Sequence, residues 1–186
     1  MICRLPLILA SSSPRRIQIL NDAGFENVKV MPADVEEGDF PLENARRKAF
    51  AIADLNPGDI VIGADTVVRF GDQVIGKPRT IDHAKEILAM LSGHRHTVST
   101  AVCIVQKRKD IVVRFEEATD IVFRQLTAAD IDFYLDKVYV LDKAGAYAIQ
   151  EHGDVLIQKI EGSFSNVIGL PIEKLKESLS YLSRFL

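Results

Sequence analysis

The feature that most constrains the fold is the run Ile60–Ala64, in which every residue is apolar or glycine and which ends at Asp65. Such a continuous run is typical of a strand covered on both faces, because a strand with one wet face alternates apolar and polar residues. Leu5–Ala10 has the same character. We therefore expect a sheet with helices packed over it, and apolar residues recur at helical spacing in Pro14–Ala23 and Pro41–Asp54.

The rest of the chain predicts further strands and helices. Gly71-Asp72 separates Val67–Phe70 from Val74-Ile75, a spacing typical of a hairpin. His96–Val105 and Ile111–Arg124 are rich in β-branched residues and joined by a charged turn, which favours antiparallel strands. The remaining predicted elements are strands at Val28–Met31 and Val155–Ile160 and helices at Thr80–Leu91, Thr127–Leu135 and Pro171–Leu182. Together these elements predict an α/β fold with a long mixed β-sheet flanked by helices.

The composition predicts one soluble domain, 1–186, without a polyanion-binding surface. The chain has 23 Lys and Arg against 26 Asp and Glu, so its formal charge of −3 gives no general attraction to nucleic acid or to an anionic membrane. Two cysteines, Cys3 and Cys103, favour free thiols over a disulfide framework. The apolar run Leu5–Ala10 is too short for a signal peptide or a membrane span. We therefore expect a cytoplasmic protein with neither membrane nor nucleic-acid partners.

The first candidate for anion binding is the segment from Ser11 to Arg16, where a buried strand ends in hydroxyls and a helix begins with Pro14, Arg15 and Arg16. A helix N-terminus presents unpaired N–H groups, and an arginine adds a fork of donors that matches phosphate oxygens. The same pattern also fits a capped helix that carries two solvated arginines. The local spacing leaves both interpretations open.

The candidate metal ligands are carboxylates. Asp65 directly follows a buried run, so we expect it where a strand emerges from the core, in position to hold Mg²⁺ or to orient water. Glu36-Glu37 follows the second predicted strand, and Lys48 lies in the next helix. An ordinary turn aspartate and a solvated glutamate pair are the alternatives. The four histidines have neither a zinc-binding spacing nor the partners of a nucleophilic triad.

Two further segments are candidates for substrate contact. Lys77 lies in the tight turn Gly76-Lys77-Pro78 and offers a compact positive charge to phosphate. Gln150 ends the small-residue stretch Asp142–Gln150, and its amide can both donate to and accept from the edge of a base. A surface glutamine after a glycine-containing strand entry explains the second segment equally well.

Taken together, these segments resemble the Maf family of nucleotide pyrophosphatases. The similarity runs in order through nearly the whole chain, which makes it far more specific than any single motif. The matching segments are Leu7–Ser11, Ser13-Pro14-Arg15-Arg16, Glu36-Glu37, Arg47-Lys48-Ala49, Ile62–Val68, Gly76-Lys77-Pro78, Leu91-Ser92-Gly93, Asp142–Gln150 and Gly162–Pro171.

The resemblance implies an elongated α/β fold similar to that of the inosine triphosphate pyrophosphatases, with two lobes around a central cleft, and a homodimer. It implies that Asp65 accepts a proton and binds a divalent cation, Mg²⁺ or Mn²⁺, together with Glu37. The positions that it implies for phosphate binding are Ser11, Arg15, Arg16, Lys48 and Lys77. The positions that it implies for substrate specificity are Arg15, Thr66 and Gln150.

The resemblance is to the branch that hydrolyses dTTP and UTP, and modified pyrimidine nucleotides are further candidate substrates. We therefore expect a metal-dependent nucleotide pyrophosphatase in which water attacks the α-phosphorus of a nucleoside triphosphate. Two alternatives stay open at this point. One is a different phosphatase that removes the γ-phosphate or acts on monophosphates. The other is a non-enzymatic regulator of cell division that binds nucleotide or nucleic acid.

Overall fold

The computed structural model describes residues 5–185, so that Cys3 lies outside the described residues. The chain divides into two compact units. Among the described residues, the first unit contains 5–65, 100–117 and 169–185, and the second contains 66–99 and 118–168. Three long strands of the sheet contribute residues to both units.

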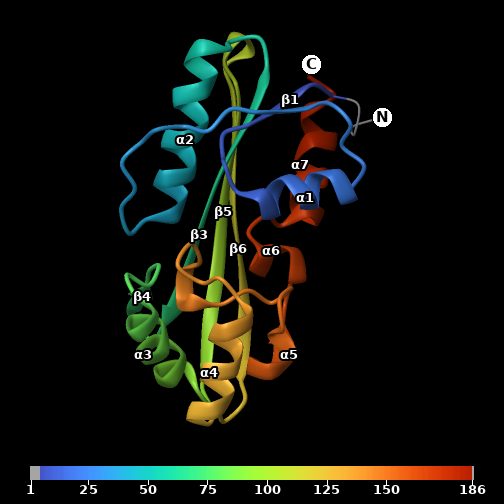
Figure 1. The fold of residues 1–186 in the computed structure, drawn as a ribbon. Coiled ribbons are helices and arrows are strands. Elements are labelled where there is room, and N and C mark those ends of the chain that lie inside the picture. The colour runs from blue at the N-terminus through green and yellow to red at the C-terminus, as the bar shows by residue number, and fades with distance from the viewer. Residues whose placement is uncertain (1–4, 186) are drawn as a thin grey trace. The chain divides into compact units, whose positions relative to one another are not determined.

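The described residues form seven strands in one mixed sheet with the order β2-β1-β3-β5-β6-β7, and β4 pairs with β3 (Figure 1). The strands are β1 Leu7–Leu9, β2 Val28–Val30, β3 Ile60–Phe70, β4 Gln73–Ile75, β5 Arg95–Gln106, β6 Ile111–Phe123 and β7 Ile157–Glu161. Strand β1 runs parallel to both β2 and β3, whereas β4 is antiparallel to β3 and β7 is antiparallel to β6. The predicted mixed sheet and the predicted β3–β4 hairpin are therefore confirmed.

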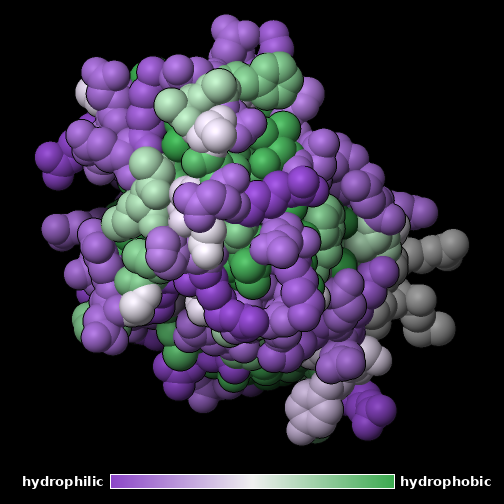
Figure 2. Space-filling model, turned by 90° about the horizontal axis from the view of Figure 1, so that it is seen from below, coloured by the Kyte–Doolittle hydropathy of each residue, from purple (hydrophilic) through white to green (hydrophobic). Residues whose placement is uncertain are grey.

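The helices largely follow their sequence signals. They are α1 Pro14–Asp22, α2 Pro41–Leu55, α3 Ile81–Leu91, α4 Ala128–Lys137, α5 Gly153–Leu156, α6 Phe164–Ile168 and α7 Ile172–Leu182, with 3-10 turns at Lys107–Lys109 and Ala144–Ala146. Thr80 caps α3, and Thr127 and Asp130 form a capping box at α4. None of the helices within residues 5–185 is both long enough and apolar enough to cross a bilayer. On the face in Figure 2 most side chains are hydrophilic, and hydrophobic ones lie between them.

The core of the first unit depends on a close approach between α2 and β3. Ala45 and Ala49 of α2 are fully buried against a cluster that includes Ile8, Val61 and the free thiol Cys103. A Cβ atom at Gly63 would lie 2.2 Å from the main-chain oxygen of Ala45 and 2.7 Å from the main-chain nitrogen of Ala49. The helix can therefore pack this tightly only because position 63 has no side chain.

The core of the second unit contains a polar pair. Its largest buried side chains include Leu88, Phe123 and Tyr134. His96 of β5 is 2% exposed, and its Nε2 lies 2.7 Å from the hydroxyl of Tyr147. Burial lowers the pKa of His96 to about 4, so the imidazole is neutral near pH 7.

Two sequence predictions are corrected by the structure. Asp65 was expected where a strand emerges from the core, but it lies inside β3, because the β-branched residues that follow it continue the strand to Phe70. The strand predicted at Val155–Ile160 begins only at Ile157, because the preceding residues form the helical turn α5, which buries Leu156 completely in the core. Helix α6 was not predicted.

Gly63→Ala tests the close approach of α2 to β3. We expect this variant to lower the free energy of unfolding by about 3 kcal/mol, because the added methyl group meets main-chain atoms that cannot turn away. Urea unfolding measures the change. Gly76→Ala is the matched control, since a Cβ atom there meets nothing within 4 Å and the stability is expected to stay the same or to rise slightly. Equal stability of the two variants would contradict this account of the packing.

Candidate functional site

The centre of the candidate site is Asp65, a carboxylate that is 7% exposed in the middle of β3. Lys48 Nζ donates to Asp65 Oδ1 at 2.7 Å, and Asn44 Nδ2 donates to Asp65 Oδ2 at 2.9 Å. Asn44 and Lys48 are four residues apart on α2, so both side chains lie on the same face of the helix. The contact at Gly63 brings that face close to the strand. Each oxygen of this buried carboxylate thus has its own donor.

Glu37 joins this centre through the same lysine. Lys48 Nζ lies 2.8 Å from Glu37 Oε1, so one ammonium group binds both carboxylates. The two side chains differ in exposure, at 50% for Glu37 and 9% for Asp65. The loop that carries Glu37 is fastened by Asn44, whose amide accepts from Gly38 N at 2.9 Å and donates to Gly38 O at 2.7 Å. Asn44 therefore connects α2 both to Asp65 and to the loop that carries Glu37.

Arg16 and Ser11 form the basic side of the site. Arg16 is 8% exposed; its Nε donates to the main-chain oxygen of Gly169 at 2.8 Å and its Nη1 to Ser11 Oγ at 3.0 Å. Burial lowers the pKa of Arg16, the negative charge of Asp65 partly opposes this, and the positive charge of Arg15 adds to it. Even so, a guanidinium stays charged near neutrality. The guanidinium is thus fixed in orientation by main-chain and hydroxyl acceptors.

The electrostatic balance of this cluster suits an anionic ligand. Arg16 and Lys48 lie beside two carboxylates, Glu37 and Asp65, and Arg15 lies close enough to Arg16 to lower its pKa, so these five side chains carry a formal charge of 3 − 2 = +1. The whole chain, in contrast, has a charge of −3. A polyphosphate would therefore be attracted by this cluster and not by the protein as a whole.

The structure brings six of the nine predicted site residues together in the first unit: Ser11, Arg15, Arg16, Glu37, Lys48 and Asp65. The other three, Thr66, Lys77 and Gln150, belong to the second unit. Lys77 and Gln150 are exposed, and Thr66 is half-buried in β3. The two segments that carry Lys77 and Gln150 are linked, because Gly145 N donates to Gly76 O at 3.1 Å.

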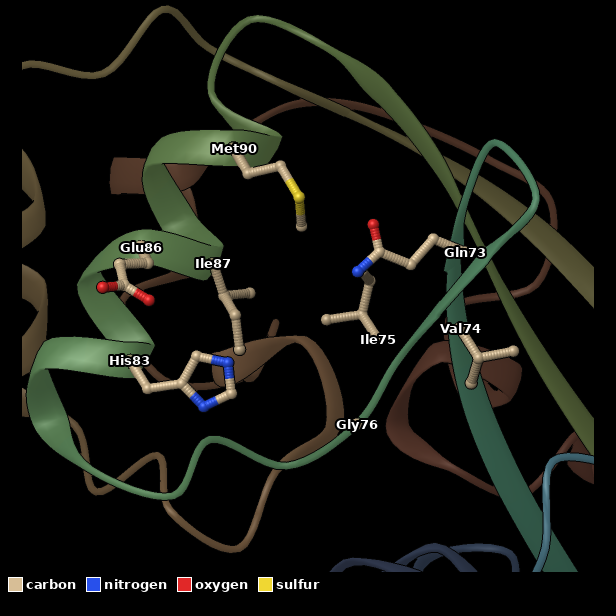
Figure 3. A pocket seen from close by; sticks show the side chains of 8 residues that line it. All are labelled: Gln73, Val74, Ile75, Gly76, His83, Glu86, Ile87 and Met90. Atoms are coloured by element: carbon tan, nitrogen blue, oxygen red, sulfur yellow. The ribbon is translucent and has the colours of Figure 1, made fainter.

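A separate pocket of about 350 Å³ lies between β4 and α3 in the second unit (Figure 3). Ile75, Ile87 and Met90 point into it. Its polar lining consists of Gln73, His83 and Glu86, without a lysine or an arginine. Since neither a lysine nor an arginine lines this pocket and one carboxylate does, it does not suit a triphosphate, and the cluster around Asp65 remains the candidate site.

The residues around Asp65 fit a divalent cation only in combination with a substrate. Within residues 5–185, no group of three or more His, Cys, Asp and Glu side chains could hold a metal ion by itself. Asp65 and Glu37 do converge on a single positive group, the ammonium of Lys48. Mg²⁺ commonly takes one or two carboxylates and completes its shell with water and phosphate oxygens. Asp65 and Glu37 thus match the protein ligands of a divalent cation whose remaining ligands are water and phosphate oxygens.

Asn44 is the site residue that the sequence analysis missed. It is 2% exposed, and both hydrogens of its amide and its carbonyl oxygen are engaged. The signal was present, because Asn44 precedes Lys48 by four residues and adjoins the small residue Ala45 on a face expected to be buried. A polar residue on such a face needs partners, and these are supplied by Asp65 and Gly38.

Comparison with known proteins supplies the family. A family model described as "Maf-like protein" matches residues 6–182. The chain belongs to the Maf family. The Maf chain is 43% identical over 176 residues to a dTTP/UTP pyrophosphatase of Anaeromyxobacter dehalogenans, covering 89% of this chain and 88% of the relative. It is 41% identical over 181 residues to a dTTP/UTP pyrophosphatase of Bacillus cereus, covering 93% of each.

A solved structure of a HAM1 protein from Coxiella burnetii is similar to the fold of this Maf chain. The TM-score is 0.58 at 15% sequence identity, and the match covers 97% of this chain and 99% of the other. This likeness concerns the fold alone. It agrees with the predicted mixed α/β architecture.

Lys48→Met tests the buried ion pair with Asp65. We expect the free energy of unfolding to fall by about 3 kcal/mol, because the substitution leaves a buried carboxylate without its cation. The double variant Lys48→Met with Asp65→Asn should regain most of that loss, because no buried charge is then left over. The matched control, Lys107→Met, breaks an exposed pair with Asp54 and should change the stability little. Chemical unfolding of all three variants measures the differences, and equal effects at positions 48 and 107 would contradict the account.

Proposed function

We propose that this Maf-family chain hydrolyses dTTP and UTP to the nucleoside monophosphate and pyrophosphate. The observation that carries the proposal is the buried Asp65 carboxylate, fixed by Asn44 and Lys48 beside Glu37 and Arg16. Both relatives reported above are named dTTP/UTP pyrophosphatases and match along almost their whole length. A fixed carboxylate within a cluster of cations is the arrangement that hydrolysis of a polyphosphate requires.

The proposed reaction begins with water at Asp65. The water oxygen forms a bond to the α-phosphorus, and the bond from that phosphorus to the bridging α,β oxygen breaks. The electron pair of the broken bond leaves with pyrophosphate, and Asp65 accepts the proton of the attacking water. The hydrogen bond from Asn44 and the ion pair with Lys48 keep the carboxylate in one orientation for that transfer.

A divalent cation, Mg²⁺ or Mn²⁺, is part of the proposal, with Asp65 and Glu37 as its protein ligands. When bound, such a cation neutralises phosphate oxygens and makes an attacking water more acidic. Ser11, Arg15, Arg16 and Lys48 provide the remaining donors to phosphate oxygens in the first unit. Arg16 is suited to this role because its contacts with Gly169 and Ser11 already fix its guanidinium.

In the second unit, Lys77 is the proposed phosphate ligand and Thr66 and Gln150 are the proposed contacts to the base. Arg15, in the first unit, is a further proposed specificity position. Modified pyrimidine nucleotides are further proposed substrates. A homodimer and a cytoplasmic location complete the proposal, the first from the family resemblance and the second from the composition. We propose no nucleic-acid partner, since the chain is acidic overall.

Product analysis of Asp65→Asn tests the proposal. The wild type, assayed with Mg²⁺ or Mn²⁺, is expected to convert dTTP and UTP to monophosphate and pyrophosphate, and a chelator should stop the reaction. Asp65→Asn keeps the size of the side chain but removes the proton acceptor, so the rate should fall by about a thousandfold. The control Asp54→Asn removes an exposed carboxylate of the same unit and should leave the rate unchanged.

Three outcomes would contradict the proposal. Release of inorganic phosphate without pyrophosphate would indicate a different phosphatase. Near-normal turnover by Asp65→Asn would remove Asp65 from the reaction. Binding of DNA that weakens with salt, with no turnover of any nucleotide, would favour the non-enzymatic regulator.

A further inference from the structure

The segment that carries Gln150 is fastened at both ends to neighbouring residues of α4. At one end, the hydroxyl of Tyr134 accepts from Ala148 N at 2.9 Å and donates to Ala148 O at 3.3 Å. At the other end, the ring of His152 lies edge-on to the ring of Phe133, with centroids 6.3 Å apart. Gln150 is exposed midway between these two anchors. Its main chain thus lies between a buried hydrogen-bonded anchor at Ala148 and a ring contact on the surface at His152.

The chain that leads into this segment is also held in an unusual conformation. Gly145 and Ala146 have φ values of 74° and 60°, and both are buried. Alanine rarely adopts a left-handed conformation, and such strain persists only where the surroundings enforce it. Tyr147 follows directly, and its buried hydroxyl lies 2.7 Å from His96 Nε2. The turn before Ala148 is therefore fixed by a polar contact with β5.

The pair of His96 and Tyr147 is a poor choice for stability alone. Either the phenol donates to Nε2 or Nε2–H donates to the phenol, and in both cases His96 Nδ1 has no hydrogen-bond partner within the described chain. A buried polar atom without a partner is unfavourable, whereas two apolar rings of the same shape would avoid that loss. The pair is explained better if the position of Tyr147, and of the segment after it, matters for function.

We infer that Tyr134, together with the Tyr147–His96 pair, positions Gln150 for recognition of the base. The inference rests on the proposed function, in which Gln150 contacts the base. Gln150 can read a base only where its main chain places the carboxamide beside the edge of that base, because the donor and the acceptor of the amide reach no further than the side chain. Selectivity therefore first requires a main chain that holds Gln150 in one place. Tyr134 and Tyr147 are positioning residues in this sense and do not contact the substrate.

The test compares base preference in a small set of variants, with the preference defined as kcat/KM for UTP divided by kcat/KM for CTP, which carry the same sugar. Tyr134→Phe removes only the hydroxyl that binds Ala148 and should lower the preference about tenfold, the effect of one misplaced hydrogen bond. Tyr139→Phe makes the same chemical change at an exposed position of the same unit and should leave the preference unchanged. On a Gln150→Ala background, Tyr134→Phe should change the preference no further, because its effect passes through Gln150.

A second variant separates positioning from stability. His96→Phe combined with Tyr147→Phe removes both polar groups and keeps the edge-on packing with Phe123, so we expect an unchanged or raised unfolding midpoint together with a lowered preference. A lowered midpoint with an unchanged preference would show a merely structural pair and would overturn this part of the inference.

Amide hydrogen exchange reports the anchoring without any assay of turnover. Amides of Ile149–His152 should exchange faster in Tyr134→Phe than in the wild type or in Tyr139→Phe. The inference would be overturned by unchanged exchange, by an unchanged preference, or by equal effects of Tyr134→Phe with and without Gln150. In each of these cases, pyrophosphate release by the wild type would still support the proposed function. If the wild type releases no pyrophosphate from any nucleotide, the proposed function fails, whereas the exchange rates still decide whether Tyr134 holds this segment.

Discussion

The contact between α2 and β3 at Gly63 is the constraint on which the candidate site depends. A side chain at that position would meet the main chain of the helix at 2.2 Å, so the two elements can approach this closely only at a glycine. The approach brings Asn44 and Lys48, one helical turn apart, to the two oxygens of Asp65. Without these two contacts Asp65 would be a buried charge without partners; with them its carboxylate is fixed. The packing of the first unit and the geometry of the candidate site therefore depend on the same main-chain contact at Gly63.

The charges around Asp65 explain how an acidic protein can attract a more acidic ligand. Burial makes an unpaired carboxylate unfavourable, and Lys48 compensates for Asp65 and Glu37 with a single ammonium group. Arg16 then adds a cation whose orientation is already set by Gly169 and Ser11. The cluster is positive although the chain is negative, so the proposed anion binding is local to this cluster. Because Asp65, Lys48 and Arg16 are each held by a named partner, little reorganisation would be needed when charge develops in the proposed reaction.

Much of the fold could be predicted from the sequence because its signals are local. The apolar run at Ile60, the hairpin turn at Gly71 and the cap at Thr127 each specify their own element. The position of Asp65 was predicted wrongly, since an apolar run shows where burial begins but not where pairing with the neighbouring strands ends. The position of Asn44 on a buried helix face indicated that it needs partners, but not which ones, because Gly38 and Asp65 are brought to it by tertiary packing. The positioning role inferred for Tyr134 likewise depends on a contact with Ala148, fourteen residues away, that no local pattern indicates.

The central claim is that water held at Asp65 attacks the α-phosphorus, and hydrolysis of dTTP in water enriched with oxygen-18 tests it most directly. Mass spectrometry of the products locates the oxygen that water contributed. We expect one labelled oxygen in the monophosphate and none in the pyrophosphate, because the bond from the α-phosphorus to the bridging oxygen is the one that breaks. Label in the pyrophosphate would place the attack at the β-phosphorus and would contradict the role proposed for the Asp65 cluster.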